Sequence, residues 1–204
     1  MLFKGCGINI VTPFTDTNEV DFDSLGRLVD TYINIGAKAL ILGRTTGEFF
    51  AMSDNEILEV VDFVVKRADK RLPVLAQTGL NDTSRSVVLS IRARALGLDG
   101  LIIASPYYSQ GNELGLISHF KSIALAGGLP AYIDNDPART GFNLEPSLIA
   151  KLAEIPNIAG IIESSSDLDH LADLSPIIND DFVLISGDDK TILAKLGMGA
   201  SGHI

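Results

Sequence analysis

Short apolar runs alternate with amphipathic helical segments along the whole chain. Eight runs with the length of buried strands begin near residues 6, 39, 73, 101, 131, 158, 182 and 200, and helical patterns separate them. A run such as residues 39–43, apolar throughout, is typical of a parallel strand that is buried on both faces. Strict alternation requires a parallel sheet covered by helices. Eight strands with seven intervening helices favour an α/β fold of the TIM (β/α)₈ barrel type, and no G-x-G-x-x-G follows the first strand to indicate a doubly wound sheet.

Capping residues mark several helix boundaries. Ser53 and Glu56 form a capping box that opens a long helix, and Gly36 ends the preceding helix as its C′ residue. Residues 187–189 are expected to cap the last helix, which runs through Leu196.

Composition limits the class of protein. The 204 residues are 46% hydrophobic and 21% charged, as in a globular protein, and we expect one domain over residues 1–204. The net charge of −10 argues against nucleic acid or an anionic membrane surface as a partner. The apolar stretches are too short to span a bilayer, and residues 1–4 do not form a signal peptide. The single cysteine, Cys6, excludes an internal disulfide, so we expect a cytoplasmic chain.

In a barrel of this type the working residues lie at the carboxyl ends of the strands. Polar side chains gather after most of the expected strands, and this position makes them candidates for a site. The candidates are Thr45, Thr46, Glu48, Tyr107, Tyr108, Asp134, Arg139, Glu163, Asp188 and Asp189.

Five ordered motifs carry a resemblance to a known family. They are Thr45-Thr46-Gly47-Glu48, Ser105-Pro106-Tyr107-Tyr108, Asn135-x-Pro137-x-Arg139-Thr140-Gly141, Asn157-Ile158-x-Gly160-Ile161-x-Glu163 and Ser186-Gly187-Asp188-Asp189. Together they resemble the dihydrodipicolinate synthase / N-acetylneuraminate lyase family of pyruvate-dependent class I aldolases. The resemblance implies a TIM barrel, usually a homotetramer, and a Schiff base between pyruvate and a lysine on strand six. It implies no cofactor and no metal.

The family's functional residues match this sequence in part. The resemblance places Thr45 in the proton relay and Thr46 beside it in carboxylate binding. Tyr108 matches the tyrosine donated across a dimer interface. Arg139 matches the arginine that holds a substrate carboxylate at the mouth. Thr45, Thr46 and Arg139 are therefore the expected binding residues for a pyruvate-like keto acid or carboxylate.

Two positions depart from the family pattern. The Schiff-base lysine falls on Ile162, and the catalytic tyrosine falls on Asp134. Isoleucine has no nucleophile to form an imine, and an ionised aspartate accepts hydrogen bonds but donates none. We therefore expect the family reaction to be lost, and we favour a non-catalytic homologue that binds a keto acid or carboxylate.

Other readings of the sequence stay open. Lys190, which follows the seventh strand, could provide a relocated imine, although a solvated helix lysine is the simpler interpretation. Asp134, Glu163, Asp188 and Asp189 could hold a divalent ion that stabilises an enolate. A third hypothesis is a subunit that assembles with a full-length relative.

Several further features have expected roles. The family continues through an eighth helix and a C-terminal helical segment, whereas this chain stops at Ile204, so we expect uncovered apolar faces and self-association as a homo-oligomer. Arg44 could bind an anion or form a salt bridge with Glu48 or Asp134. The histidines His119 and His170 are interpreted as ordinary surface or groove residues.

Overall fold

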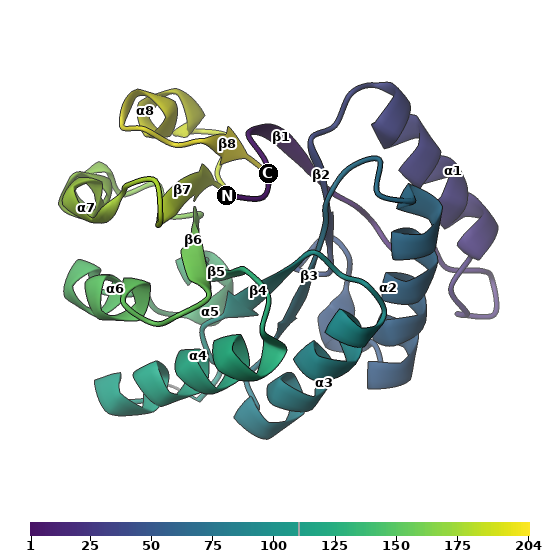
Figure 1. The fold of residues 1–204 in the computed structure, drawn as a ribbon, viewed down its shortest axis with the longest axis horizontal. Helices are drawn as coiled ribbons and strands as arrows, with labels where there is room; N and C mark the ends of the chain where they lie inside the picture. The colour runs from purple at the N-terminus through teal and green to yellow at the C-terminus, as the bar shows by residue number, and fades with distance from the viewer. Residues whose placement is uncertain (110) are drawn as a thin grey trace.

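Eight parallel strands close into a barrel in chain order (Figure 1). The structure, a computed structural model, describes residues 1–109 and 111–204. The strands are β1 (Gly5–Asn9), β2 (Ala39–Leu42), β3 (Val74–Gly79), β4 (Gly100–Ala104), β5 (Ala131–Asn135), β6 (Ile158–Glu163), β7 (Val183–Ser186) and β8 (Gly202–His203). The sheet closes because β8 pairs with both β7 and β1. The predicted α/β TIM-barrel fold is confirmed.

Helices surround the strands, and all of them except the short α5, which lies beside β5, form an outer ring (Figure 1). They are α1 (Phe22–Asn34), α2 (Asp54–Ala68), α3 (Thr83–Ala95), α4 (Glu113–Gly127), α5 (Pro137–Thr140), α6 (Pro146–Ala153), α7 (Leu168–Leu174) and α8 (Ile192–Gly197), with 3₁₀ turns at η1 (Phe49–Ala51) and η2 (Ser175–Ile177). No helix follows β8 within the residues that the structure describes. In the same residues no helix is both long and apolar enough to cross a membrane.

The capping predictions are correct for α2 and wrong for α8. The Ser53 side chain accepts from the Glu56 amide and the Glu56 side chain accepts from the Ser53 amide, which completes the capping box. Helix α8 begins only after Thr191, and Asp188 accepts hydrogen bonds from the amide and hydroxyl of Thr191 instead. Asp188 therefore fixes the turn before the helix and does not cap the helix directly.

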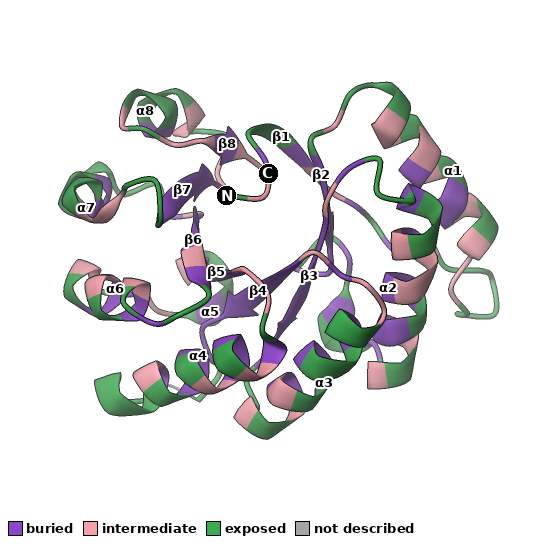
Figure 2. Ribbon diagram, viewed as in Figure 1, coloured by how far each residue is buried: buried purple, intermediate pink, exposed green. Residues whose placement is uncertain are grey.

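Two apolar clusters hold the barrel together. The outer cluster packs the strands against the helices. In Figure 2 the buried residues, in purple, lie on the strands and on the helix faces that are turned towards them. The inner cluster fills the barrel itself with side chains from β2 to β7 and from Phe3. Its buried members are Phe3, Ala39, Ile41, Leu75, Ile102, Tyr132, Ile162, Val183 and Ile185. Side chains two residues further along each strand continue this inner face towards the carboxyl end of the barrel.

Candidate functional site

Two cavities open at the carboxyl end of the barrel. The first, which we call the lumen cavity, has a volume of about 290 Å³, and the second, the rim cavity, has a volume of about 510 Å³. The polar and charged residues of the lumen cavity include Thr45, Gln77, Tyr107, Asp134, Asp136 and Arg139. Those of the rim cavity include Arg44, Thr46, Asp188, Asp189, Lys190 and Arg139. The structure thus brings most of the sequence-predicted candidates to one end of the molecule.

The mouth is crossed by an ion pair between Arg44 and Asp134. Arg44 Nη2 lies 2.8 Å from Asp134 Oδ1, and Arg44 Nε donates to Oδ2 at 3.1 Å. Arg44 Nη2 also donates to the Ser164 hydroxyl at 3.2 Å and lies 3.9 Å from Asp136 Oδ2. Both partners are buried. Burial opposes the charge on Arg44, but attraction and hydrogen bonding to Asp134 outweigh it and raise the pKa of the guanidinium.

The turn after β2 places Arg44 for this contact. Gly43, Arg44 and Glu48 all have a positive φ, of 82°, 54° and 57°. The Gly47 amide donates to the Gly43 carbonyl at 2.9 Å, and a Cβ on Gly47 would lie 2.7 Å from that carbonyl oxygen. The turn is therefore too tight for any other residue at position 47. Of the two partners predicted for Arg44, Asp134 is correct and Glu48 is not.

Ile162 and Asp134 are direct neighbours in the sheet. They pair in register on the parallel strands β6 and β5. Ile162 is fully buried in the inner cluster, and Asp134 lies two residues beyond Tyr132, another inner residue. The two positions that the sequence resemblance matches to the family's lysine and tyrosine therefore form one continuous piece of the inner wall.

Arg139 and Asp136 add charge to the mouth. Arg139 lies on α5, is exposed, and its guanidinium has no hydrogen-bond or ion-pair partner among residues 1–109 and 111–204. Asp136 is partly buried, and burial together with the nearby Asp134 charge raises the pKa of its carboxyl, against the attraction of Arg44 and Arg139. A free guanidinium that lines both cavities is suited to bind a carboxylate.

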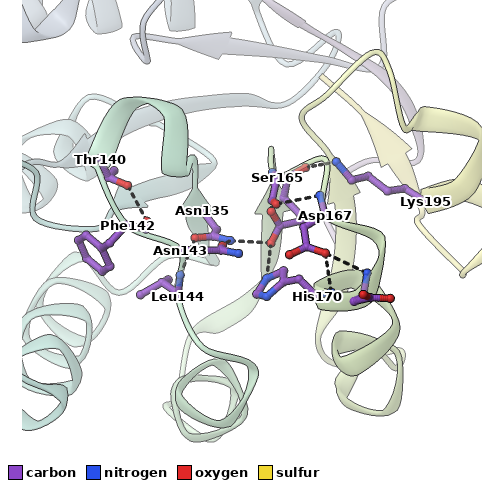
Figure 3. A network of polar contacts seen from close by, with 11 residues as sticks. Asn135, Thr140, Phe142, Asn143, Leu144, Ser165, Asp167, His170 and Lys195 are labelled. Carbon is purple, nitrogen blue, oxygen red and sulfur yellow. Dashed lines mark hydrogen bonds and ion pairs between the residues drawn. The ribbon is translucent and has the colours of Figure 1, made fainter.

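The carboxylate of Glu163 has a structural role, and its partners Asn135, Ser165 and His170 are labelled in Figure 3. Its Oε2 accepts from Asn135 Nδ2 at 2.7 Å and its Oε1 accepts from the Ser165 amide at 2.6 Å. His170 Nε2 lies 3.3 Å from Oε2. Glu163 is fully buried on the outer side of the barrel wall, next to the inward-facing Ile162. These contacts fix the loop after β6, and they leave no free carboxylate for chemistry or metal binding.

His119 and His170 are both buried, so their interpretation as ordinary surface or groove residues is wrong. His170 hydrogen-bonds to Glu163, and this bond is the main reason why its pKa is raised above 6.5. His119 Nδ1 lies 2.8 Å from the Thr83 hydroxyl, and burial lowers the pKa of His119. A histidine in a partly apolar helical sequence is compatible with either a buried or a surface position, so the sequence alone could not decide between them.

Lys195 is a buried lysine that the sequence analysis passed over. Its Nζ donates to the Glu163 carbonyl at 2.8 Å, from helix α8 and outside the barrel (Figure 3). Burial lowers the pKa of the amine despite attraction to Glu163 and Asp188. Lys195 lines neither the lumen cavity nor the rim cavity. Lys195 lies on the face of α8 that is turned towards the strands, and this position in the helix could have indicated that the residue is buried.

Gln77 is the second residue that the sequence analysis missed. It lies on β3 two residues beyond the inner residue Leu75, lines the lumen cavity and is only 1% exposed. Neither its Nε2 nor its Oε1 has a hydrogen-bond partner in the described part of the chain. The period-two pattern of β3 could have placed it on the inner face.

The remaining acidic candidates do not form a metal site. Asp189 Oδ1 lies 2.9 Å from His203 Nε2. Hydrogen bonds from Thr191 lower the pKa of the Asp188 carboxyl. Among residues 1–109 and 111–204 no three histidine, cysteine, aspartate or glutamate side chains are grouped to hold an ion. Lys190 is exposed at the edge of the rim cavity.

The comparison with known proteins decides the family. The model of the dihydrodipicolinate synthetase family matches residues 2–204. The chain belongs to this family. A 4-hydroxy-tetrahydrodipicolinate synthase from Caldicellulosiruptor bescii is 41% identical over 203 residues, which is 100% of this chain and 68% of the relative.

Solved structures agree with the family assignment. A dihydrodipicolinate synthase from Aquifex aeolicus is 35% identical with a TM-score of 0.95, and the match covers 99% of this chain and 69% of that one. A chloride-inhibited dihydrodipicolinate synthase from Acinetobacter baumannii, complexed with pyruvate, is 36% identical with a TM-score of 0.94, over 98% of this chain and 69% of that one. The resemblance drawn from the five motifs is confirmed.

The two tyrosines of the motif that resembles the dihydrodipicolinate synthetase family lie in different surroundings. Tyr107 lines the lumen cavity, and its ring packs edge-on against Phe50 at a centroid distance of 5.1 Å. Tyr108 is 97% exposed with a φ of 69°, and it lines neither cavity. Its expected role across a subunit interface stays a prediction.

Proposed function

We propose that this chain is a member of the dihydrodipicolinate synthetase family that binds a small keto acid or other carboxylate without forming the family's imine. The observation that carries the proposal is the inner wall of β5 and β6, where Asp134 and Ile162 stand side by side. One is tied to Arg44 in a buried ion pair and the other is a fully buried apolar side chain. Neither offers an amine or a proton-shuttling hydroxyl.

The chemistry of the family supports this reading. A class I aldolase needs an uncharged amine within reach of the keto carbonyl, because the imine serves as the electron sink. None of the described residues that line the lumen cavity is a lysine. We therefore infer that a keto acid in this cavity keeps its carbonyl.

Arg139 and Thr45 supply the carboxylate recognition in this proposal. Both line the lumen cavity and the rim cavity, so a small ligand in either position reaches them. Arg44 is held by Asp134, so Arg139 is the unpaired cation among the described residues that line the lumen cavity, and the exposed Lys190 accompanies it in the rim cavity. Thr46 takes part from the rim cavity, where its hydroxyl accepts from Asn9 Nδ2 at 3.0 Å.

Isothermal titration calorimetry with pyruvate tests the binding. We expect the Arg139→Gln variant to bind pyruvate about ten- to a hundredfold more weakly, since a charge-assisted hydrogen bond contributes about 1.5–3 kcal/mol. Asp136→Asn should bind it more tightly, because it removes a competing negative charge from both cavities. Arg92→Gln, the same charge change on the outer face of α3, is the matched control. Equal affinities in all four proteins would contradict the proposed pocket.

Three alternatives remain as hypotheses with separate readouts. An active lyase with a relocated imine requires Lys190, and a metal-stabilised enolate requires turnover that depends on an added divalent ion. An assembly role requires co-purification with a full-length relative. We also propose a cytoplasmic location and a homo-oligomer, which rest on the family and on the single cysteine.

A further inference from the structure

The lumen cavity contains a polar group that the family chemistry does not use. Gln77 is buried to 99% of its surface, and both atoms of its amide lack a partner among the described residues. A buried amide without a partner is costly, and nearly all such groups in proteins are hydrogen-bonded. The amide faces a cavity of about 290 Å³, which is enough for a small molecule.

The surroundings of Gln77 restrict what can bind to it. The rings of Phe50 and Tyr107 and the methyl group of Ala104 provide apolar walls. The charges of Asp134 and Arg44 neutralise each other in their ion pair. Among the described residues that line the cavity, Gln77 is the buried one whose polar side-chain atoms lack a hydrogen-bond partner, and Arg139 is the cation at the edge.

A primary amide is both a donor and an acceptor. A ligand ketone can accept from Gln77 Nε2 but has nothing to donate to Oε1, whereas a ligand amide satisfies both atoms at once. A site that hydrogen-bonds a ligand's polar group discriminates against analogues without that group, because the protein's own buried polar group then has no partner.

We propose that Gln77 makes the lumen cavity selective for small carboxylates that also carry an amide. The carboxylate binds Arg139 and Thr45, and the amide pairs with Gln77. This inference rests on the proposed carboxylate-binding function and names the ligand class of the same site.

Matched pairs of ligands test the inference. Oxamate and pyruvate, malonamate and acetoacetate, and succinamate and levulinate each differ only by an amino group in place of a methyl group. Calorimetry should show that the amide of at least one pair binds about three- to tenfold more tightly than the matching ketone. This is the gain in affinity expected from one additional hydrogen bond. The three lengths cover the unknown spacing between the carboxylate and the amide.

The Gln77→Met variant keeps the size of the side chain and removes both polar atoms. We expect it to lose the preference for amides, with the amide-to-ketone affinity ratio falling to about one. Tyr132→Phe is the matched control, because it removes the hydroxyl that accepts from the Leu2 amide deeper in the barrel and should leave the ratio unchanged. A preference that persists in Gln77→Met would overturn the assignment.

A stability measurement separates ligand recognition from a structural role. Because the Gln77 amide has no hydrogen-bond partner among residues 1–109 and 111–204, Gln77→Met without ligand should unfold at the same temperature as the parent or a few degrees higher. A marked drop in the unfolding temperature would indicate that the amide holds the barrel together and would count against the inference.

Propionamide distinguishes this inference from the broader proposal. If amide and ketone acids bind equally, the selectivity of Gln77 is wrong while carboxylate binding stands. If propionamide binds to the parent and no longer to Gln77→Met while no carboxylate binds, the carboxylate proposal fails and amide recognition by Gln77 stands. If no probe binds, both are overturned.

Discussion

The guanidinium of Arg44 binds both carboxylate oxygens of Asp134, although ninety residues separate them in the chain. The contact joins the turn after β2 to the inner wall of β5, across the mouth of the barrel. It explains how a carboxylate is tolerated where the family resemblance expects a tyrosine. Arg44 and Asp134 depend on each other, because Asp134 alone would be a buried charge without a counter-ion and Arg44 alone would keep only Asp136, at 3.9 Å.

Breaking this pair should destabilise the protein more than replacing it. Arg44→Met leaves the buried Asp134 charge unpaired, and Asp134→Leu leaves Arg44 with only Asp136 at 3.9 Å, so either change alone should lower the free energy of unfolding, by up to about 3–5 kcal/mol. The double variant should cost much less than the sum of the two single changes. Urea unfolding of the four proteins measures this coupling, and additive effects would contradict a mutually dependent pair.

The buried pair of His170 and Glu163 predicts how stability depends on pH. The pKa of His170 is raised in the folded protein, so the folded state binds more protons than the unfolded state at pH values near and above 6.5. The stabilisation is complete below the unfolded pKa and is lost as the pH rises through the folded pKa. Urea midpoints between pH 6 and pH 9 should therefore fall less steeply in His170→Gln than in the parent. Parallel pH curves would show that this pair contributes nothing.

Lys195 predicts an effect of the opposite sign. Burial lowers the pKa of this amine, so the unfolded chain binds more protons between the folded pKa and 10.5, and the charge costs stability at neutral pH. The Glu163 carbonyl also accepts from the Gly187 amide at 2.9 Å and stays paired without the lysine. Lys195→Met should raise the free energy of unfolding at pH 7 by about 1 kcal/mol, and Lys121→Met on α4 is a control at a solvent-facing lysine. A loss of stability in Lys195→Met alone would mean that the hydrogen bond outweighs desolvation.

The fold could be predicted from the sequence because it depends on a pattern that repeats. The apolar runs predicted each strand within about two residues, as in the sixth strand, which was expected at residues 158–162 and is observed at Ile158–Glu163. The short helix α5 and the late start of α8 were not predicted, since each depends on the geometry of a single turn.

The candidate site could be predicted only in part. Motifs at strand ends placed Thr45, Asp134 and Arg139 correctly at the mouth. The sequence left two partners open for Arg44, because the choice depends on a turn with positive φ at position 44. Gln77 was missed because no motif marks it, and its importance comes from a cavity that exists only in the folded barrel.

The measurement that tests the central claim most directly is intact mass after incubation with pyruvate and reduction with borohydride. An imine-forming lysine would be trapped as a stable adduct, whereas a carboxylate bound through Arg139 would leave the mass unchanged. We predict an unchanged mass, with a class I aldolase labelled in parallel as the control. A single adduct that maps to Lys190 or Lys195 would contradict the account and establish a working imine at a new position.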